Sequence, residues 1–276
     1  MLTLARITEA ILPLIYCGAV SVYALAFFRR EEGFTRWQRP ALLAALLAHT
    51  VLIYAQTAYH GHCLVYTPFE MLTLISFTIT LTYLIVELLS GEKGTGVFFI
   101  GLALLLQTVS TALSPSIGDA GANPVLLNNT VGIHISAALI GYTGFAISAV
   151  YGALYLMLYH QIRSNHFGTF YQRLPSLQLL ERMSEKSAMM GVIFLTVAIA
   201  IALIFLPDVL PTFSYGDPKL IVTIGIWGIY VAALVGKYLM RMEGRKVVIL
   251  SLVGFIGTII SMTLINFVLS GFHRFQ

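Results

Sequence analysis

The sequence predicts an all-α membrane protein with eight transmembrane helices. Its 276 residues are 58% hydrophobic and only 10% charged, with a mean hydropathy of +0.87, which excludes an ordinary soluble domain. Apolar stretches of roughly 20 residues, enough to cross about 30 Å of hydrocarbon, run at 7–28, 40–59, 69–89, 95–114, 131–159, 187–206, 218–240 and 247–268. Since no linker separates them, we expect residues 1–276 to form one polytopic helical bundle.

The distribution of basic residues predicts the orientation of this bundle. If the N-terminus lies outside, three of the sixteen basic residues fall on the outer side, namely Arg6, Lys219 and Arg274. The inner loops hold the others: Arg29, Arg30, Arg36, Arg39, Lys93, Arg163, Arg173, Arg182, Lys186, Lys237, Arg241, Arg245 and Lys246. Because cytoplasmic loops carry the Lys/Arg excess, we expect both termini on the outer, extracytoplasmic face. The bilayer and its anionic lipids account for the positive charge, so no nucleic-acid partner is expected.

The fifth span, 131–159, has a face of small residues that should point into the bundle. At 100° per residue this face carries His134, Gly141, Phe145, Ser148 and Gly152. Gly144 extends it into a track of small residues four apart, which lets helices approach closely in lipid. The following connection, 160–186, contains leucine and methionine spaced three apart after a plausible N-cap at Ser176. It predicts a short amphipathic helix at the inner membrane surface; a solvated connector is the alternative.

Two histidines are predicted to lie at the same depth on the outer face. His134 opens the fifth span, and His273 follows the outer end of the eighth. Neutral imidazole is a common iron ligand, and two histidines can hold one haem iron. Asn266 and Ser270 lie on the same side of the eighth helix as His273 and could orient a ligand. From spacing alone, the alternative is that both histidines cap helix ends.

Two further ionisable residues are candidates. His49 lies in the middle of the second span, where a titratable side chain is a functional candidate, although it can also simply hydrogen-bond a neighbouring helix. Glu70 begins the third span at the outer face; it could pair with Lys219 or orient a histidine, or it could cap the helix N-terminus. Four more histidines lie in the connections: His60, His62, His160 and His166. The two cysteines form no CxxCH motif that would attach a haem covalently.

Four segments resemble the cytochrome c assembly family, which includes CcsA, CcmC and HemX-like proteins. IHISAALIGYTGFAISAVYGALYL (133–156) is similar to the family's "HV…GY…F…YL" helix, and INFVLSGFHRF (265–275) to its "N…LSGLHSY" ending. YTPFEML (66–72) resembles the "P…YES" start of its third helix, and YGDPK (215–219) the end of its "WDPK" segment. The resemblance implies that His134 and His273 are external axial ligands of a non-covalent haem b.

The sequence also departs from the synthases of this family. Their Trp-rich WGxWWxWDPK segment is replaced by LPTFSYGDPK (210–219). Their transmembrane histidine, in "YLHTR", falls at Val235, with Lys237 in place of the arginine. Half of the inner haem site is therefore missing, unless His49 acts with another partner. These departures, the length and the eight spans resemble the HemX-like branch, which is associated with haem or tetrapyrrole homeostasis or with cytochrome c assembly.

The sequence therefore predicts a haem-handling protein of the bacterial cytoplasmic (inner) membrane, acting in cytochrome c biogenesis and not as a conventional enzyme. Its expected partners are haem and either an assembly subunit or apocytochrome c. One alternative is a membrane regulator of haem biosynthesis that contacts a soluble haem-synthesis enzyme through 160–186. Another is a small-molecule transporter, which would need inverted repeats and broken helices.

Overall fold

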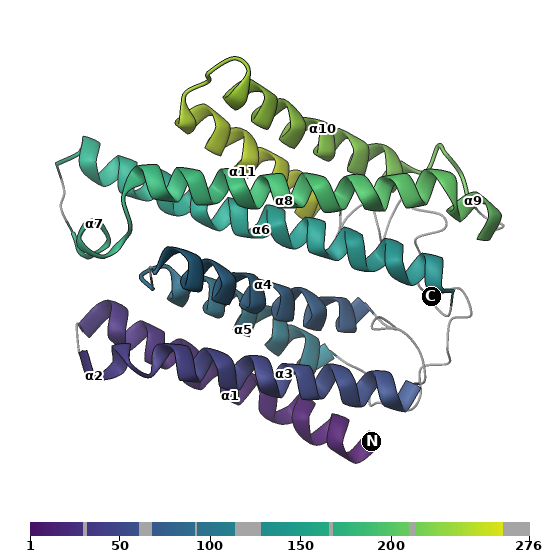
Figure 1. The fold of residues 1–276 in the computed structure, drawn as a ribbon, viewed down its shortest axis with the longest axis horizontal. Helices are drawn as coiled ribbons and strands as arrows, with labels where there is room; N and C mark the ends of the chain where they lie inside the picture. The colour runs from purple at the N-terminus through teal and green to yellow at the C-terminus, as the bar shows by residue number, and fades with distance from the viewer. Residues whose placement is uncertain are drawn as a thin grey trace. The chain divides into compact units, whose positions relative to one another are not determined.

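The computed structural model describes residues 1–29, 32–60, 68–91, 93–113, 128–165, 168–209 and 213–261, and in these ranges all regular structure is helical. Figure 1 shows the helices as two groups. The long helices are α1 (Leu2–Arg29), α3 (Gln38–His60), α4 (Pro68–Ser90), α5 (Gly96–Leu113), α6 (Asn129–Arg163), α8 (Leu177–Ile204), α10 (Pro218–Tyr238) and α11 (Gly244–Ile260). Three short helices join them: α2 (Glu32–Thr35), α7 (Thr169–Arg173) and α9 (Leu206–Val209).

Seven of the described helices are long and apolar enough to cross a membrane, so the chain is a multi-pass membrane protein. They are α1, α3, α4, α5, α6, α8 and α10. The eighth predicted span, 247–268, begins as α11, and its remaining residues lie outside the described ranges. The number eight and the side of each terminus therefore stay predictions.

The chain divides into two compact units, which we describe separately. Unit 1 comprises Met1–Leu127 and Gln172–Pro175 and contains α1 to α5. Here α1 packs on α3 and α5, and α4 packs on α5. The largest fully buried side chains of this unit include Tyr16, Tyr23, Tyr83 and Phe99. The interior of unit 1 is thus rich in tyrosine, whose hydroxyl groups need hydrogen-bond partners when buried.

Unit 2 comprises Asn128–Tyr171 and Ser176–Gln276, and α6 and α8 pack along one another within it. The residues predicted to point inward on α6 are buried, namely Gly141, Gly144, Phe145, Ser148 and Gly152, but so is every residue from 141 to 149, so this part of the helix is enclosed on all sides. A Cβ atom at Gly144 would lie 2.7 Å from the backbone nitrogen of Gly191. The ring of Phe145 stacks on Tyr230 of α10, with ring centroids 3.6 Å apart. Glycine on both helices therefore allows the closest approach within unit 2.

The expectation of a separate short amphipathic helix within 160–186 is wrong, because the residues from Leu177 onward belong to a long helix. The alternative of a solvated connector stays a prediction for the residues before Leu177. Ser176 is indeed an N-cap, accepting a hydrogen bond from the backbone of Leu179, but the helix that it starts continues without a break to Ile204. Its first turns are part of α8 because Leu180 and Ser184 are buried in unit 2. Two acidic residues of these turns, Glu181 and Glu185, form ion pairs with Lys237 of α10.

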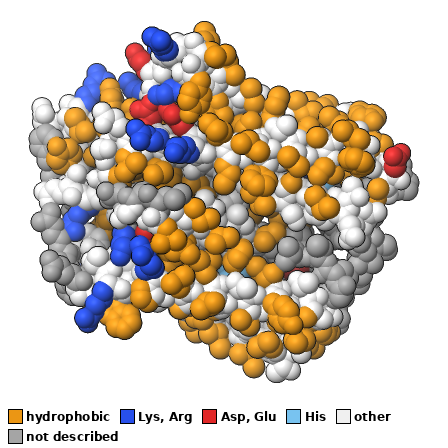
Figure 2. Space-filling view, in the orientation of Figure 1, with side chains coloured by type: hydrophobic (Ala, Val, Ile, Leu, Met, Phe, Trp, Pro, Cys, Tyr) orange, Lys and Arg blue, Asp and Glu red, His pale blue; other side chains and the backbone are white. Residues whose placement is uncertain are grey.

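Figure 2 shows the surface that such a membrane protein presents. Hydrophobic side chains cover much of the visible face of each unit, and within each unit the visible Lys and Arg side chains lie mainly near one end of its helices. Exposed apolar side chains such as Leu14, Leu47 and Leu105 belong to span-length helices. This distribution is typical of helices surrounded by lipid.

Candidate functional site

His134 lies on α6, in the turn that follows its N-cap. The side chain of Asn128 caps this helix by accepting a hydrogen bond from the backbone of Thr130. The Nδ1 atom of His134 is 2.9 Å from the backbone oxygen of Ala198 on α8. Because a carbonyl oxygen only accepts, Nδ1 must carry the proton. In the neutral ring Nε2 then presents a lone pair, and this is the form in which histidine binds a metal.

The segment before α10 brings a charged pair towards this histidine. Asp217 is buried and caps α10, its Oδ1 accepting from the backbone nitrogen of Lys219 at 2.8 Å. The ammonium group of Lys219 is close enough to act electrostatically on His134. Phe213 and Tyr215, in the segment that replaces the Trp-rich sequence, form an edge-to-face pair with centroids 5.0 Å apart. Unit 2 thus places a histidine and a lysine near one another, with an aromatic pair on the segment that leads to the lysine.

The structure does not test the other predicted residues of the haem site. His273, Asn266 and Ser270 lie outside the described residues, and so does His62. Glu70 lies in the first turn of α4, as its capping alternative requires, and is half-buried. In the described ranges we find no group of three His, Cys, Asp or Glu side chains that could hold a metal ion. The haem-binding pair therefore stays a prediction.

His49 is fully buried in unit 1 and hydrogen-bonded to a neighbouring helix, as one of the two interpretations expected. Its Nδ1 is 2.9 Å from the hydroxyl of Tyr16, which is also 2.9 Å from the hydroxyl of Thr80. Thr80 donates its proton to the backbone oxygen of Ser76. By proton count, Tyr16 then donates to Thr80 and accepts from Nδ1 of His49. Nε2 of His49 is buried without a hydrogen bond of normal geometry, although the backbone of Thr73 is close enough to interact with the ring.

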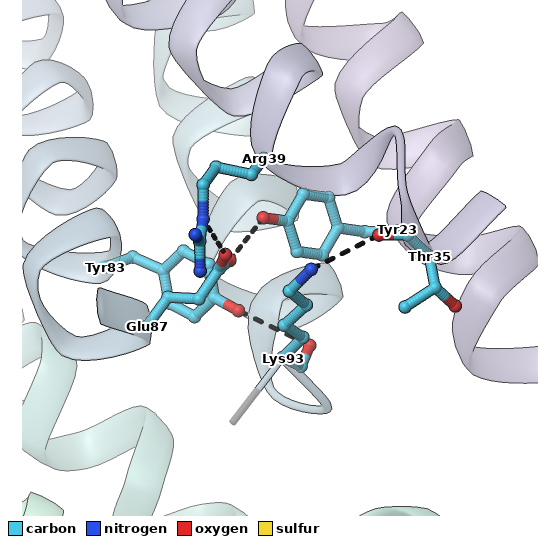
Figure 3. A network of polar contacts seen from close by, with 6 residues as sticks. All are labelled: Tyr23, Thr35, Arg39, Tyr83, Glu87 and Lys93. Atoms are coloured by element: carbon cyan, nitrogen blue, oxygen red, sulfur yellow. Dashed lines mark hydrogen bonds and ion pairs between the residues drawn. The ribbon is translucent and has the colours of Figure 1, made fainter. Parts of the chain in front are cut away.

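A second polar network in unit 1 was not predicted. Glu87, near the end of α4, is completely buried. Its Oε2 accepts from the hydroxyl of Tyr23 at 2.5 Å, and its Oε1 from Nε of Arg39 at 3.2 Å (Figure 3). Lys93, also labelled in Figure 3, donates to the backbone oxygen of Thr35. The position of Glu87 near the end of an apolar span gave no signal for burial, because its cationic partner comes from 48 residues earlier in the chain.

A third polar cluster links α8 and α10 of unit 2. Lys237 of α10 forms ion pairs with Glu181 and Glu185 of α8, the second at 3.0 Å. Nearby, the guanidinium group of Arg245 lies over the ring of Tyr159, 5.2 Å from its centroid. The spacing of Glu181 and Glu185, four apart on one helix, was the only sequence signal for this cluster. Val235, which occupies the position of the synthases' histidine, is 43% exposed.

Comparisons with known proteins agree with the motifs. The family model described as "Cytochrome C assembly protein" matches residues 43–273, a range that includes His49, His134 and His273. "Protein HemX" of Bacillus subtilis (strain 168) is 24% identical over 94% of this chain and 96% of its own length. "Protein HemX" of Brevibacillus brevis is 23% identical over 82% and 83%. "Cytochrome c biogenesis protein CcsA" of Gloeobacter violaceus is 20% identical over 93% and 91%.

A solved structure has the same fold over most of the chain. "Cytochrome c Heme Lyase CcmF" is similar with a TM-score of 0.64 over 93% of this chain, at 14% sequence identity. This chain corresponds to 46% of the length of that structure. The two proteins therefore share a fold, and the present chain corresponds to about half of the longer CcmF chain.

Proposed function

Because the chain belongs to the cytochrome c assembly protein family, whose model matches residues 43–273, we propose that it holds haem for cytochrome c biogenesis. The group bound is one non-covalent haem b, and its iron is held between His134 and His273. The site lies at the outer face of the bacterial cytoplasmic membrane. A partner subunit or apocytochrome c receives the haem.

The observation that carries this proposal is the hydrogen bond between His134 and Ala198. Histidines that bind metals commonly donate their other ring N–H to a carbonyl or carboxylate, which fixes the ring and its tautomer. In His134 the Nδ1 proton is used in this way, at 2.9 Å, by a backbone atom that cannot rotate away. The free Nε2 is then a ready axial ligand for iron.

The surroundings of His134 suit a haem that carries two carboxylates. Lys219 acts electrostatically on this part of unit 2, and its ammonium can pair with a propionate. Asn266 and Ser270, which precede His273, supply further hydrogen-bond donors in the proposed site. When haem is bound, its iron supplies the redox chemistry; the chain holds the iron through imidazole and excludes other ligands from it.

An optical spectrum of the purified protein tests the proposal. We expect reduced and oxidised spectra of low-spin haem with two histidine ligands. His134→Gly and His273→Gly should each lower the haem content or give a high-spin form, and added imidazole should restore the low-spin spectrum. His160→Gly, which changes an exposed histidine near the other end of α6, is the matched control. Wild-type protein that takes up no haem from excess would contradict the proposal.

The two relatives named HemX support a second candidate, a membrane regulator of haem synthesis. In this case a soluble haem-synthesis enzyme would bind the connection between α6 and α8. Because α6 ends at Arg163 and α8 starts at Leu177, this connection is short and comprises residues 164–176. Co-purification of such an enzyme, lost when this connection is replaced by a Gly/Ser linker, would favour the regulator over the haem carrier.

A further inference from the structure

The guanidinium group of Arg39 is anchored on a buried carboxylate at one end of unit 1. Arg39 lies in the first turn of α3, and its Nε donates to Oε1 of Glu87, which is 0% exposed. The other carboxylate oxygen of Glu87 accepts from Tyr23 of α1 at 2.5 Å. Figure 3 shows the carboxylate between these two partners. Two groups therefore fix Glu87, and Glu87 in turn fixes Arg39.

The anchoring uses only a small part of the guanidinium group. Arginine has five N–H donors in a planar fork, and the described contact of Arg39 with Glu87 uses the one on Nε. The side chain of Arg39 remains 44% exposed. Its outer nitrogens are thus held in place on a rigid support while they remain accessible.

The surroundings of Arg39 are those of a membrane–water interface. Trp37, two residues earlier, is 54% exposed, and the guanidinium of Arg36 lies over its ring, 5.8 Å from the centroid. Lys93 lies in the same network through its bond to Thr35. Residues 29–39 contain four basic and two acidic residues. Tryptophan beside basic residues at the end of an apolar span is typical of the headgroup layer.

We propose that Arg39, held by Glu87, binds the phosphate of an anionic phospholipid headgroup, with Arg36 and Lys93 adding positive charge around it. Guanidinium matches phosphate through two parallel N–H···O bonds, and a fork that is already fixed loses less entropy on binding than a mobile one. The lipid phosphate, and not free phosphate, is the ligand because α3 continues from this site directly into the apolar span.

For the variant Glu87→Gln, the proposal and simple attraction by net charge predict opposite changes in the affinity for an anionic lipid. Glu87→Gln removes a negative charge, so attraction by net charge alone would strengthen the binding of an anionic lipid. If anchoring matters, the same variant frees Arg39 and weakens binding about tenfold, the loss expected for one charge-assisted hydrogen bond. Arg39→Lys keeps the charge but lacks the fork, and should weaken binding to a similar extent.

The test measures lipid retained by the detergent-purified full chain, using native mass spectrometry during titration with phosphatidylglycerol. Phosphatidylcholine and inorganic phosphate serve as separate titrants, and the wild type should prefer phosphatidylglycerol over both. Lys246→Gln removes an exposed lysine of unit 2, whose described ion pair is with Glu243, and should leave the affinity unchanged. Thermal denaturation shows whether each variant is folded.

Unchanged or tighter phosphatidylglycerol binding by folded Glu87→Gln would overturn the proposal, as would equal binding of phosphatidylcholine by the wild type. Competition by inorganic phosphate at equal concentration would show that the site does not recognise a lipid. If Glu87→Gln fails to fold, Arg39→Lys decides the matter. Tyr23→Phe, which removes one support of Glu87 without a change of charge, should give an intermediate loss.

Discussion

At the scale of single residues, two histidines are held in the same tautomer for different uses. His134 and His49 each donate from Nδ1, to the backbone oxygen of Ala198 and to the hydroxyl of Tyr16 respectively. His134 is half-buried near a helix end, whereas His49 of α3 is fully buried against α1 and α4. The first can meet a ligand from outside the bundle. The second contributes mainly to the packing of unit 1.

His49→Ala should therefore separate structure from haem binding. The variant removes the donor to the buried hydroxyl of Tyr16, which keeps its bond to Thr80, and we expect a loss of about 1–3 kcal/mol in the free energy of unfolding. The low-spin haem spectrum proposed for the outer site should persist. Denaturation and optical spectra of the same sample would measure both effects. Loss of haem from a folded variant would instead assign His49 to a transmembrane haem site.

The sequence predicted the residues on the inward face of α6 but not the polar networks. Periodicity identifies which side of a helix is buried, so His134 and Gly144 could be assigned to one face. It does not identify which residues meet across helices: Glu87 and Arg39 are 48 positions apart, and Lys237 and Glu181 are 56 apart. Such contacts depend on how the helices pack. The place of His273 relative to His134 stays a prediction for the same reason.

At the scale of helices, the backbones of α6 and α8 lie close together at Gly144 and Gly191. Substitution of a glycine tests whether this close packing stabilises the protein. A Cβ atom at position 144 would lie 2.7 Å from Gly191 N and 2.8 Å from Ser187 O, both backbone atoms that cannot move aside alone. Gly144→Ala should cost about 1–3 kcal/mol through overpacking. Gly225→Ala, on an exposed face of α10 with nothing within 4 Å, should be neutral or stabilising by up to about 1 kcal/mol. Thermal denaturation of both variants measures the difference, and equal effects would contradict the packing described.

The ion pairs between α8 and α10 make a second prediction for helices. Lys237→Met leaves Glu185, whose side chain is 9% exposed, without its cation. We expect a loss of about 1–3 kcal/mol, since an uncompensated charge then remains in a poorly solvated position. Lys246→Met breaks only an exposed pair with Glu243 and should change stability by less than about 1 kcal/mol. A similar, small effect of both changes would show that the Lys237 cluster is solvated.

The span of α8 also shows why the helix boundaries were harder to predict than the helices. Charged residues at 181, 182, 185 and 186 suggested that the apolar span began at 187. In the structure the helix begins ten residues earlier, at Leu177, after the N-cap Ser176, and Lys237 pairs with Glu181 and Glu185 within its first turns. A hydropathy value depends only on the residue type, so it contains no information on whether a charged side chain has a partner in the folded protein. The seven span-length helices themselves were predicted, since long apolar stretches depend on no distant contact.

At the scale of the whole molecule, the orientation in the membrane is the main open prediction. With both termini outside, a membrane-impermeant thiol reagent applied to intact cells should label Gly118→Cys and Gln276→Cys in a cysteine-free background. Glu92→Cys and Glu243→Cys should react only after the cells are permeabilised. The physical reason is the predicted excess of Lys and Arg in the loops that contain the second pair. The reverse labelling pattern would place His134 on the cytoplasmic side and contradict the proposed haem site.

The unbroken course of α8 has a mechanical consequence. Ala198, whose carbonyl fixes His134, lies 21 residues after the first residue of this helix, or about 30 Å along its axis. A continuous helix transmits an axial shift from end to end because its hydrogen bonds resist compression. A partner that displaced the first turn of α8 by a fraction of an ångström would therefore stretch the bond to His134 at a distance of one bilayer thickness. In the predicted orientation the first turn of α8 is cytoplasmic and His134 lies at the outer face, so a partner bound to this turn would act on the imidazole from across the membrane.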